Sequence, residues 1–331
     1  MPTPNAPPEA LSADVVARFR DDVERLTGAG GALRLGVAVS GGPDSMAMLL
    51  LARAAFPGCL EAATVDHGLR AESGSEADLV ASTCAALGVP HATLVVTVGR
   101  RGNVSANART ARYEALNGWR LAQGLGWLAT AHHADDQLET VIMRLNRGSG
   151  VGGLAGIRAR TGPIIRPLLR WRRSELAAIV AAAGVASIDD PSNRDDRYDR
   201  ARLRKLLADA DWLDPVAVAT SAENLAEADA ALAATVEIAL AERLFPRPDG
   251  SWAFDGEGLP REIARRALVQ CLRRIEPGAA PRSETIDAAL AALATGTAIS
   301  LGTVLASTKG GEWVFRPAPP RRVIQPPPAT A

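Results

Sequence analysis

A turn rich in serine and glycine, Ser40 to Ser45, holds the first residues whose types and spacing could do chemistry. It follows the apolar run Leu35 to Val39 and precedes helix-forming residues, Met46 to Ala55. A strand that turns through two glycines into a helix leaves free backbone N–H groups at the helix N-terminus, and such groups bind anions. Glycine also lets the backbone approach a phosphate closely. The candidate phosphate-binding residues are Ser40, Gly41, Gly42, Pro43, Asp44 and Ser45.

Asp44 is the unusual member of this turn, because a carboxylate beside a phosphate repels it. One explanation is that Asp44 holds a divalent cation that bridges to the phosphate. The alternative is that Asp44 only caps the helix that follows. The turn has neither the GKS or GKT of a Walker loop nor the spacing of a GxGxxG fingerprint, so it belongs to neither motif.

The second chemical group is the string HHADDQLE, which starts at His132. His132, Asp136 and Glu139 are spaced i, i+4 and i+7, which places them on one face of a helix that begins here. His132 and His133 are adjacent and have no third ligand for zinc, so Mg²⁺ on carboxylates fits phosphate chemistry better. The alternative is that Asp135 and Asp136 cap the start of the helix.

Two smaller groups complete the candidate site. Asp66 and His67 directly follow an apolar strand, where they could contact the ribose or base of a nucleotide. The alternative for Asp66 is that it satisfies N–H groups of its own loop. Arg109 and Arg112 are three residues apart, so they share a helix face. They point either to a phosphate or other substrate, or to solvent.

Arginines dominate the middle of the chain. Between Thr140 and Ser174 the sequence has no acidic residue, and its glycine-rich part, 148–156, predicts a flexible basic loop. A second basic cluster follows Asp199, which can cap a helix. Such a surface suits an RNA backbone, and a solvated run of charges is the alternative. The candidate RNA-binding residues are Arg147, Arg170, Arg172, Arg173, Arg200, Arg202 and Arg204.

The order of these motifs resembles the tRNA(Ile)-lysidine synthase family. SGGPDS after a strand is similar to the PP-loop of the N-type ATP pyrophosphatases in general. HHADDQLET, RGSGVGGLAGI and DPSN are more specific to this one family, and VDHGLR, NARTARYEAL and RPLL also match it. The resemblance covers about Leu33 to Leu207. Ala201 departs from it, because the family has Asn at that place.

The resemblance implies an ATP-dependent ligase. Such an enzyme uses ATP and Mg²⁺ to activate C2 of the wobble cytidine of tRNA(Ile), anticodon CAU, by adenylating O2. It then attaches the ε-amine of L-lysine and releases pyrophosphate and AMP, which changes the specificity of the tRNA from Met to Ile. The implied catalytic residues are Asp44, Arg112, His133, Asp136 and Glu139. The implied ATP-binding residues are Ser40, Gly41, Gly42, Pro43, Asp44, Ser45, Asp66 and His67. Asp44 and Asp136 would hold Mg²⁺, and the seven candidate RNA-binding arginines named above would bind the tRNA.

Alternating strands and helices position these groups. The alternation indicates an α/β fold, a parallel sheet with helices on both faces, in the Rossmann-like manner of a PP-loop ATPase. Ligands of such sheets bind at the carboxyl ends of strands, where the motifs lie. The predicted strands are Leu35 to Val39, Cys59 to Asp66, His91 to Val98, Gly126 to Ala131 and Ile164 to Leu169. The predicted helices are Met46 to Ala55, Ser73 to Leu87, Val104 to Gln123, Asp135 to Arg147 and one after Asp199.

A smaller, mainly helical C-terminal domain with a β-hairpin is expected to follow and to grip the tRNA. The predicted segments are a tail and leading helix, 1–30, the PP-loop catalytic domain, 31–210, the helical tRNA-binding domain, 211–316, and a Pro-rich tail, 317–331. Within the second domain we expect helices at Asp209 to Glu242, Glu262 to Ile275 and Glu284 to Leu293, a connection at Phe245 to Pro260, and a hairpin at Thr297 to Phe315.

Composition excludes several classes of protein. The 37 basic and 37 acidic residues cancel, so any nucleic-acid site must come from local clustering. Cys59, Cys84 and Cys271 are scattered, which argues against zinc, iron–sulfur and disulfide frameworks. With a start that lacks an apolar signal region, they point to the cytoplasm. No apolar run approaches the roughly 18 residues of a membrane span. The sequence is compatible with a homodimer.

Three other functions compete with the ligase. A PP-loop cytidine thiolase would need cysteines for sulfur transfer or a cluster, and the chain has no CxxC. Amide-forming PP-loop ligases, such as NAD or GMP synthetases, lack the DPSN segment with its arginine-rich helix. A non-catalytic nucleotide-binding module would not require Asp44, Asp136 and Glu139, since simple binding of ATP has no need of them.

Overall fold

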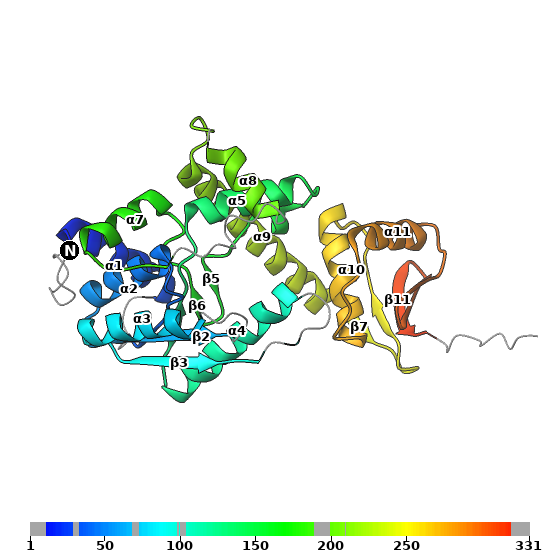
Figure 1. Cartoon of the computed structure of the whole chain (residues 1–331). Coiled ribbons are helices and arrows are strands. Elements are labelled where there is room, and N and C mark those ends of the chain that lie inside the picture. The colour runs from blue at the N-terminus through cyan, green and yellow to red at the C-terminus, as the bar shows by residue number, and fades with distance from the viewer. Residues whose placement is uncertain are drawn as a thin grey trace, which may run out of the picture. The chain divides into compact units, whose positions relative to one another are not determined.

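The computed structural model describes residues 11–28, 33–67, 73–97, 99, 104–188, 199–208 and 210–318. The chain forms two compact units, Met1–Ala226 and Glu227–Ala331 (Figure 1). The long helix α9 (Pro215–Arg243) crosses from one unit into the other, whereas we placed the domain boundary at 210/211 from the sequence. The two predicted tails fall largely on 1–10 and 319–331, which lie outside the described residues.

The first unit is built on a six-stranded sheet with the order β3-β2-β1-β4-β6-β5. Five strands run parallel, and β5 pairs antiparallel with β6 at one edge. The predicted parallel sheet is confirmed. The order reverses between β1 and β4, and ligands of open α/β sheets bind at such a switch point. The strands are β1 Leu35–Ala38, β2 Leu60–Asp66, β3 His91–Val95, β4 Trp127–Ala129, β5 Arg160–Thr161 and β6 Ile164–Ile165.

Helices cover both faces of this sheet, as predicted (Figure 1). Alternate residues of a strand face opposite sides, so Leu35 and Val37 of β1 enter the core with α2, whereas Ala38 of β1 packs with α4. Gly36 must be glycine, because a β-carbon there would lie 2.8 Å from the ring of Trp119. The helices are α1 Ala13–Thr27, α2 Pro43–Ala55, α3 Ser73–Leu87, α4 Val104–Ala122, α5 Ala134–Leu145, α6 Val151–Leu154, α7 Arg173–Ala182 and α8 Asp199–Ala208.

The glycine-rich segment 148–156, predicted as a flexible loop, is held in place. It includes the short helix α6. Arg144 donates a hydrogen bond to the carbonyl of Gly153 (2.6 Å). The buried amide of Gln137 exchanges two hydrogen bonds with the backbone of Ile157. Side-chain donors from α5 satisfy carbonyls that a glycine-rich loop would otherwise leave exposed, so the segment has a defined conformation and its predicted flexibility stays a prediction.

The second unit pairs α10 and α11 with an antiparallel sheet of order β7-β8-β11-β10-β9. The predicted hairpin is β10 and β11, joined at Gly310 and Gly311, both of which have positive φ. The predicted connection 245–260 instead contributes strands, which are too short to show a periodic pattern. The elements are β7 Leu244–Pro246, β8 Trp252–Phe254, α10 Arg261–Ile275, α11 Ser283–Ala294, β9 Ile299–Leu301, β10 Val304–Lys309 and β11 Glu312–Pro317.

The helix α9 begins later than the predicted start at Asp209. Pro215 is its first residue, a position where a missing N–H costs nothing. Asp214 accepts a hydrogen bond from the backbone N–H of Val216 (2.8 Å), which fixes the helix start. Although α9 has 29 residues, neither it nor any other described helix is long and apolar enough to cross a membrane.

Candidate active site

The turn between β1 and α2 leaves backbone N–H groups open at a helix N-terminus. Gly42 is the N-cap of α2 and no side chain caps this end, so the N–H groups of the first turn stay open. Gly41 has φ +85°, and a β-carbon on it would lie 2.4 Å from the side chain of Ile188. The hydroxyl of Ser45 donates to the carbonyl of Gly42 (2.9 Å) and accepts the N–H of Ser40 (3.1 Å). The turn is therefore held in one shape by its own serine.

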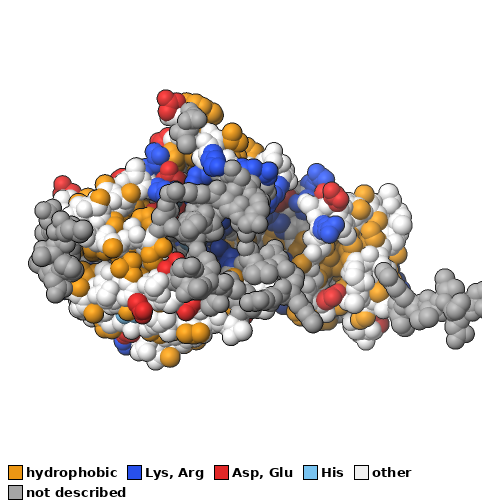
Figure 2. Space-filling view, viewed as in Figure 1, with side chains coloured by type: hydrophobic (Ala, Val, Ile, Leu, Met, Phe, Trp, Pro, Cys, Tyr) orange, Lys and Arg blue, Asp and Glu red, His pale blue; other side chains and the backbone are white. Residues whose placement is uncertain are grey.

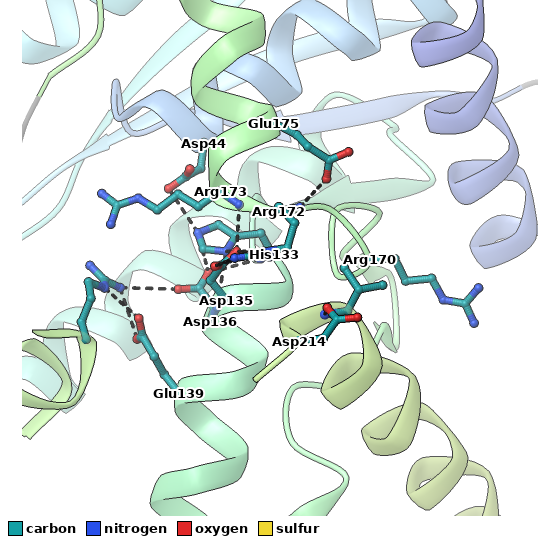
Figure 3. Close-up of polar contacts among 12 residues, drawn as sticks. Asp44, His133, Asp135, Asp136, Glu139, Arg170, Arg172, Arg173, Glu175 and Asp214 are labelled. Atoms are coloured by element: carbon teal, nitrogen blue, oxygen red, sulfur yellow. Dashed lines mark hydrogen bonds and ion pairs between the residues drawn. The ribbon is translucent and has the colours of Figure 1, made fainter. Parts of the chain in front are cut away.

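Asp44 faces a histidine at the start of α5 (Figure 3). Its Oδ2 lies 3.5 Å from Nε2 of His133, and Oδ2 of Asp136 lies 3.5 Å from the same nitrogen. Because Gly42 is the N-cap, the alternative that Asp44 caps α2 is wrong. The other oxygen of Asp44, Oδ1, is buried and has no hydrogen-bond partner among the described residues. One acceptor is therefore left for a cation or a ligand.

The start of α5 is fixed by a reciprocal cap between His133 and Asp136. Asp136 accepts the backbone N–H of His133 (3.2 Å), and the ring Nδ1 of His133 accepts the backbone N–H of Asp136 (3.3 Å). The capping alternative is thus confirmed for Asp136. Asp135 instead accepts the N–H of Arg173 (2.8 Å) and pairs with Arg172 (3.2 Å), which ties α5 to the start of α7. Since Nδ1 of His133 is an acceptor, its Nε2 carries the proton toward the carboxylates.

The pKa values of the two neighbouring histidines shift in opposite directions. Burial lowers the pKa of His133, but a hydrogen bond to Asp44 and the surrounding carboxylates outweigh burial and raise it. Burial lowers the pKa of His132 to about 4, where Arg166 adds to the effect and Asp136 opposes it. Nδ1 of His132 lies 3.1 Å from the hydroxyl of Thr130. His132 is therefore a neutral hydrogen-bonding group at neutral pH.

Glu139 lies deeper, where it pairs with an arginine of α8. Nε and Nη2 of Arg204 donate to its two carboxylate oxygens at 2.7 and 3.2 Å. Arg204 also lies 3.8 Å from Asp136, and Arg200 donates to the hydroxyl of Thr140 (3.2 Å). Burial lowers the pKa of Arg204, and the hydrogen bond to Glu139 outweighs burial and raises it. A predicted catalytic carboxylate and a predicted RNA-binding arginine are thus partners.

An open cavity of about 520 Å³ brings the predicted motifs together. Gly41 and Glu139 do not line it: the carbonyl of Gly41 accepts the N–H of Ile188, and Glu139 lies behind Arg204. The predicted residues that line it are Ser40, Gly42, Pro43, Asp44, Ser45, Asp66, His67, Arg109, Arg112, His132, His133, Asp136, Arg173, Arg200 and Arg204. Their individual roles stay predictions.

The far wall of the cavity is formed by α4 and the end of β2. Nε of Arg112 donates to Nε2 of His67 (3.4 Å), and Nδ1 of His67 is buried without a partner among the described residues. Burial, and then the charge of Arg112, lower the pKa of His67. In the described part of the chain, neither Arg109 nor Arg112 lies within ion-pair distance of a carboxylate. This wall therefore offers two arginines and a neutral histidine to a ligand.

Sequence reasoning missed several residues that line the cavity. Thr64 lies two residues before Asp66, so the strand periodicity could have placed both on one face. Tyr113 is one helical turn beyond Arg109, whose guanidinium lies 5.1 Å from the ring centroid. Ile188 carried no such signal, because it reaches the phosphate turn only through tertiary contact.

The predicted cationic surface is divided between inner and outer arginines. Figure 2 shows Lys and Arg side chains gathered over α8 and the neighbouring part of α5. Arg147, Arg170 and Arg202 are exposed, and Arg170 pairs with Glu223, whereas Arg172 is partly buried and pairs with Asp135. Other arginines of the acid-free segment donate to backbone carbonyls instead, namely Arg144, Arg158 and Arg166.

Parts of the predicted motifs fall outside the described residues. These are Gly68 to Arg70 of VDHGLR, Asn103 of the α4 motif, and 189–198, which includes DPSN. The side chains of Ser73, Asp199 and Ala201 are outside as well, so the capping predicted for the first two stays a prediction.

The strand–turn–helix geometry, the open helix N-terminus and the switch-point cavity define a nucleotide-binding PP-loop protein. The PP-loop domain family matches residues 16–210, which is more than half of the chain. The chain therefore has the PP-loop fold and uses ATP.

Known proteins narrow this class. The tRNA(Ile)-lysidine synthase of Novosphingobium aromaticivorans is 43% identical over 321 residues, which cover 95% of this chain and 97% of that one. The tRNA(Ile)-lysidine synthase of Zymomonas mobilis is 39% identical and covers 87% of this chain and 90% of its own. The chain belongs to the tRNA(Ile)-lysidine synthase family. A solved U34-tRNA thiolase of Methanococcus maripaludis shares the fold alone, with a TM-score of 0.53 and 17% identity over 65% of this chain and 80% of that chain.

Proposed function

We propose that this chain converts the wobble cytidine of a tRNA(Ile) with anticodon CAU into lysidine, with ATP and L-lysine as co-substrates. It is an ATP-dependent ligase that modifies tRNA. The observation that carries the proposal is that one cavity brings the phosphate turn together with Asp136 of α5 and the arginines of α4 and α8. Activation of a base by ATP and its attack by an amine need these groups in one place.

In the first step, O2 of the cytosine attacks the α-phosphate of ATP, and pyrophosphate leaves. The open N–H groups of the first turn of α2 hold the pyrophosphate. Arg109 and Arg112 face the same space from α4 and stabilise the charge that develops on the phosphates. His67 offers its free Nδ1–H to the ribose or base of the nucleotide, because Arg112 occupies Nε2.

In the second step, the ε-amine of lysine attacks C2 of the activated cytosine, and AMP leaves with O2. We assign Asp136 and Glu139 to the lysine amine, since both carboxylates belong to α5 beside the cavity. Glu139 is already paired with Arg204, so an incoming ammonium group must displace that guanidinium. The attacking amine must be neutral, and a nearby carboxylate or imidazole accepts its proton.

The donor set fits Mg²⁺. Asp44 has a buried oxygen without a hydrogen-bond partner, and Asp136 approaches the same face of His133. Among the described residues, no group of three or more His, Cys, Asp or Glu side chains could hold a metal ion. Mg²⁺ prefers oxygen ligands, and two carboxylates together with phosphate oxygens and waters would supply them. When bound, Mg²⁺ neutralises the charge that develops on the phosphates.

The remaining arginines and the second unit are assigned to the tRNA. Arg147 and Arg202 are exposed beside the cavity-lining arginines of α8, as a phosphate backbone requires. The second unit packs α10 and α11 on its sheet and would grip the tRNA away from the chemistry. We place the reaction in the cytoplasm.

The test is incorporation of radiolabelled lysine into an unmodified tRNA(Ile) transcript with a CAU anticodon, with ATP and Mg²⁺ present. We expect one pyrophosphate and one AMP for each lysine attached. Asp136→Ala and Glu139→Ala should abolish transfer, whereas Glu284→Ala, an exposed carboxylate of α11, should not. Full activity in the first two variants would refute their roles. Pyrophosphate release without lysine transfer would reject lysine as the nucleophile.

A further inference from the structure

An exposed tryptophan lies close to the basic helix α8. Trp212 is 80% exposed, although burying a tryptophan removes more apolar surface from water than burying any other side chain. It belongs to the connection between α8 and α9, which protrudes at the top of Figure 1. Leu206, on the last turn of α8, is 73% exposed, and Leu145 at the end of α5 is exposed as well. A tryptophan left so exposed is available for contact with a partner.

The backbone holds Trp212 in a defined place. It is the third residue of a turn closed by a hydrogen bond from the N–H of Leu213 to the carbonyl of Ala210 (3.1 Å). Asp214, two residues later, accepts a hydrogen bond from the backbone N–H of Val216 in the first turn of α9 (2.8 Å). The ring is therefore presented by a fixed turn between two helices, which lowers the entropy lost when a partner binds.

The basic helix that precedes Trp212 in the chain favours a nucleobase as the partner. α8 carries Arg200, Arg202, Arg204 and Lys205, and no acidic residue follows Asp199 within it. Cationic and aromatic side chains together are typical of surfaces that bind single-stranded RNA. The carboxylate of Asp211, directly before Trp212, disfavours a phosphate at this point. The contact is therefore with the face of a base rather than with the backbone.

The distance to the cavity is short enough for one RNA loop to reach both. Arg204 lines the cavity, and α8 ends about 6 Å further along its axis at Ala208. The four residues from there to Trp212 span at most about 14 Å. The Cα atom of Trp212 thus lies within about 20 Å of the Cα atom of Arg204, which is a separation of a few nucleotides.

We infer that Trp212 is a stacking platform for an unpaired base of the anticodon loop, a neighbour of the base that enters the cavity. This inference rests on the proposed function. The platform holds the loop from outside while the reacting base is turned into the site. Its affinity comes from stacking, which every base can provide, so it positions the loop without reading its sequence.

The test uses a CAU anticodon stem-loop RNA in which each loop purine is replaced in turn by 2-aminopurine, whose fluorescence falls on stacking. With the unaltered protein we expect quenching at one or more of these positions. Trp212→Ala should lose that quenching and weaken binding on the order of 10-fold or more, and Trp212→Phe should keep most of both. Leu121→Ala, an equally apolar and 62% exposed position on α4, is the matched control and should change neither.

Unchanged quenching and affinity in Trp212→Ala would overturn the platform while leaving the ligase proposal intact. A change in sedimentation of that variant without a change in RNA binding would also overturn it, and would assign the ring to a protein contact. If the unaltered protein does not bind the stem-loop, the proposed function fails instead. Because Trp212 is exposed, these variants are expected to fold, which their thermal midpoints will verify.

Discussion

The ion pair between Glu139 and Arg204 gives the sharpest prediction, because its partners are buried so unequally. The carboxylate side chain is 4% exposed and the guanidinium side chain 32%. Arg204→Ala strands a charge that water cannot reach, whereas Glu139→Gln leaves a cation that water can solvate. Breaking a buried pair costs about 3–5 kcal/mol and a surface pair about 0–1 kcal/mol. We therefore expect a loss of about 3 kcal/mol for Arg204→Ala and about 1 kcal/mol for Glu139→Gln.

Urea unfolding of the single variants and of the double variant measures this asymmetry. Removing the stranded charge should restore stability, so the double variant should be more stable than Arg204→Ala by about 2 kcal/mol. Arg34→Ala breaks a pair with Glu61 whose arginine is 55% exposed, and serves as the control with a loss below about 1 kcal/mol. A double variant no more stable than Arg204→Ala would refute the reasoning, because Glu139 would then not be stranded.

Three further outcomes are expected. In Gly156→Ala the new residue has φ +60° and its β-carbon lies 2.4 Å from Gln137, so the thermal midpoint should fall by the equivalent of about 1–3 kcal/mol. Gly118→Ala is the control: no atom of the described residues lies near its β-carbon on α4, and the midpoint should rise slightly. The pKa of His132 is about 4 in the folded protein, against about 6.5 for an unfolded histidine, so the unfolded state binds the proton first as the pH falls. The contribution of His132 to stability is therefore full above about pH 6.5 and falls by up to about 3 kcal/mol toward about pH 4. His132→Gln should flatten this pH dependence, as measured by unfolding at several pH values. Asp135→Asn should cost about 1–2 kcal/mol at neutral pH in urea unfolding, because it weakens the bonds to the start of α7.

The first unit could be predicted from the sequence because its signals are local. The strand before Ser40 is apolar and ends in a glycine turn, and the cap at His133 lies within four residues. Such patterns depend only on neighbours in the chain. The strands of the second unit depend on distant partners: Trp252 pairs with Phe315, and three residues are too few to show a period. Sequence reasoning therefore found the hairpin and missed the sheet that contains it.

The directions of the arginines could not be predicted. The acid-free segment has a uniform charge, but charge along the chain does not tell which side of an element a side chain takes. Arg144 and Arg166 donate to carbonyls inside the unit, whereas Arg147 is exposed. A long side chain with five donors can satisfy buried backbone as readily as a phosphate. Arg144 and Arg166 bond the backbone rather than a phosphate because the carbonyls of Gly153 and Arg158 lie within their reach, and tertiary structure sets the positions of these carbonyls.

Capping and chemistry need not exclude each other at Asp136. β1 and β4 are adjacent parallel strands, so the helices that follow them, α2 and α5, begin at the same edge of the sheet. This brings Asp44 and Asp136 to one nitrogen of His133, each at 3.5 Å. Asp136 uses Oδ2 for the cap, and among the described residues its Oδ1 has a 3.8 Å contact to Arg204. A carboxylate has two oxygens, so Asp136 can cap the helix with one oxygen and still offer the other to a ligand, as the proposed function requires.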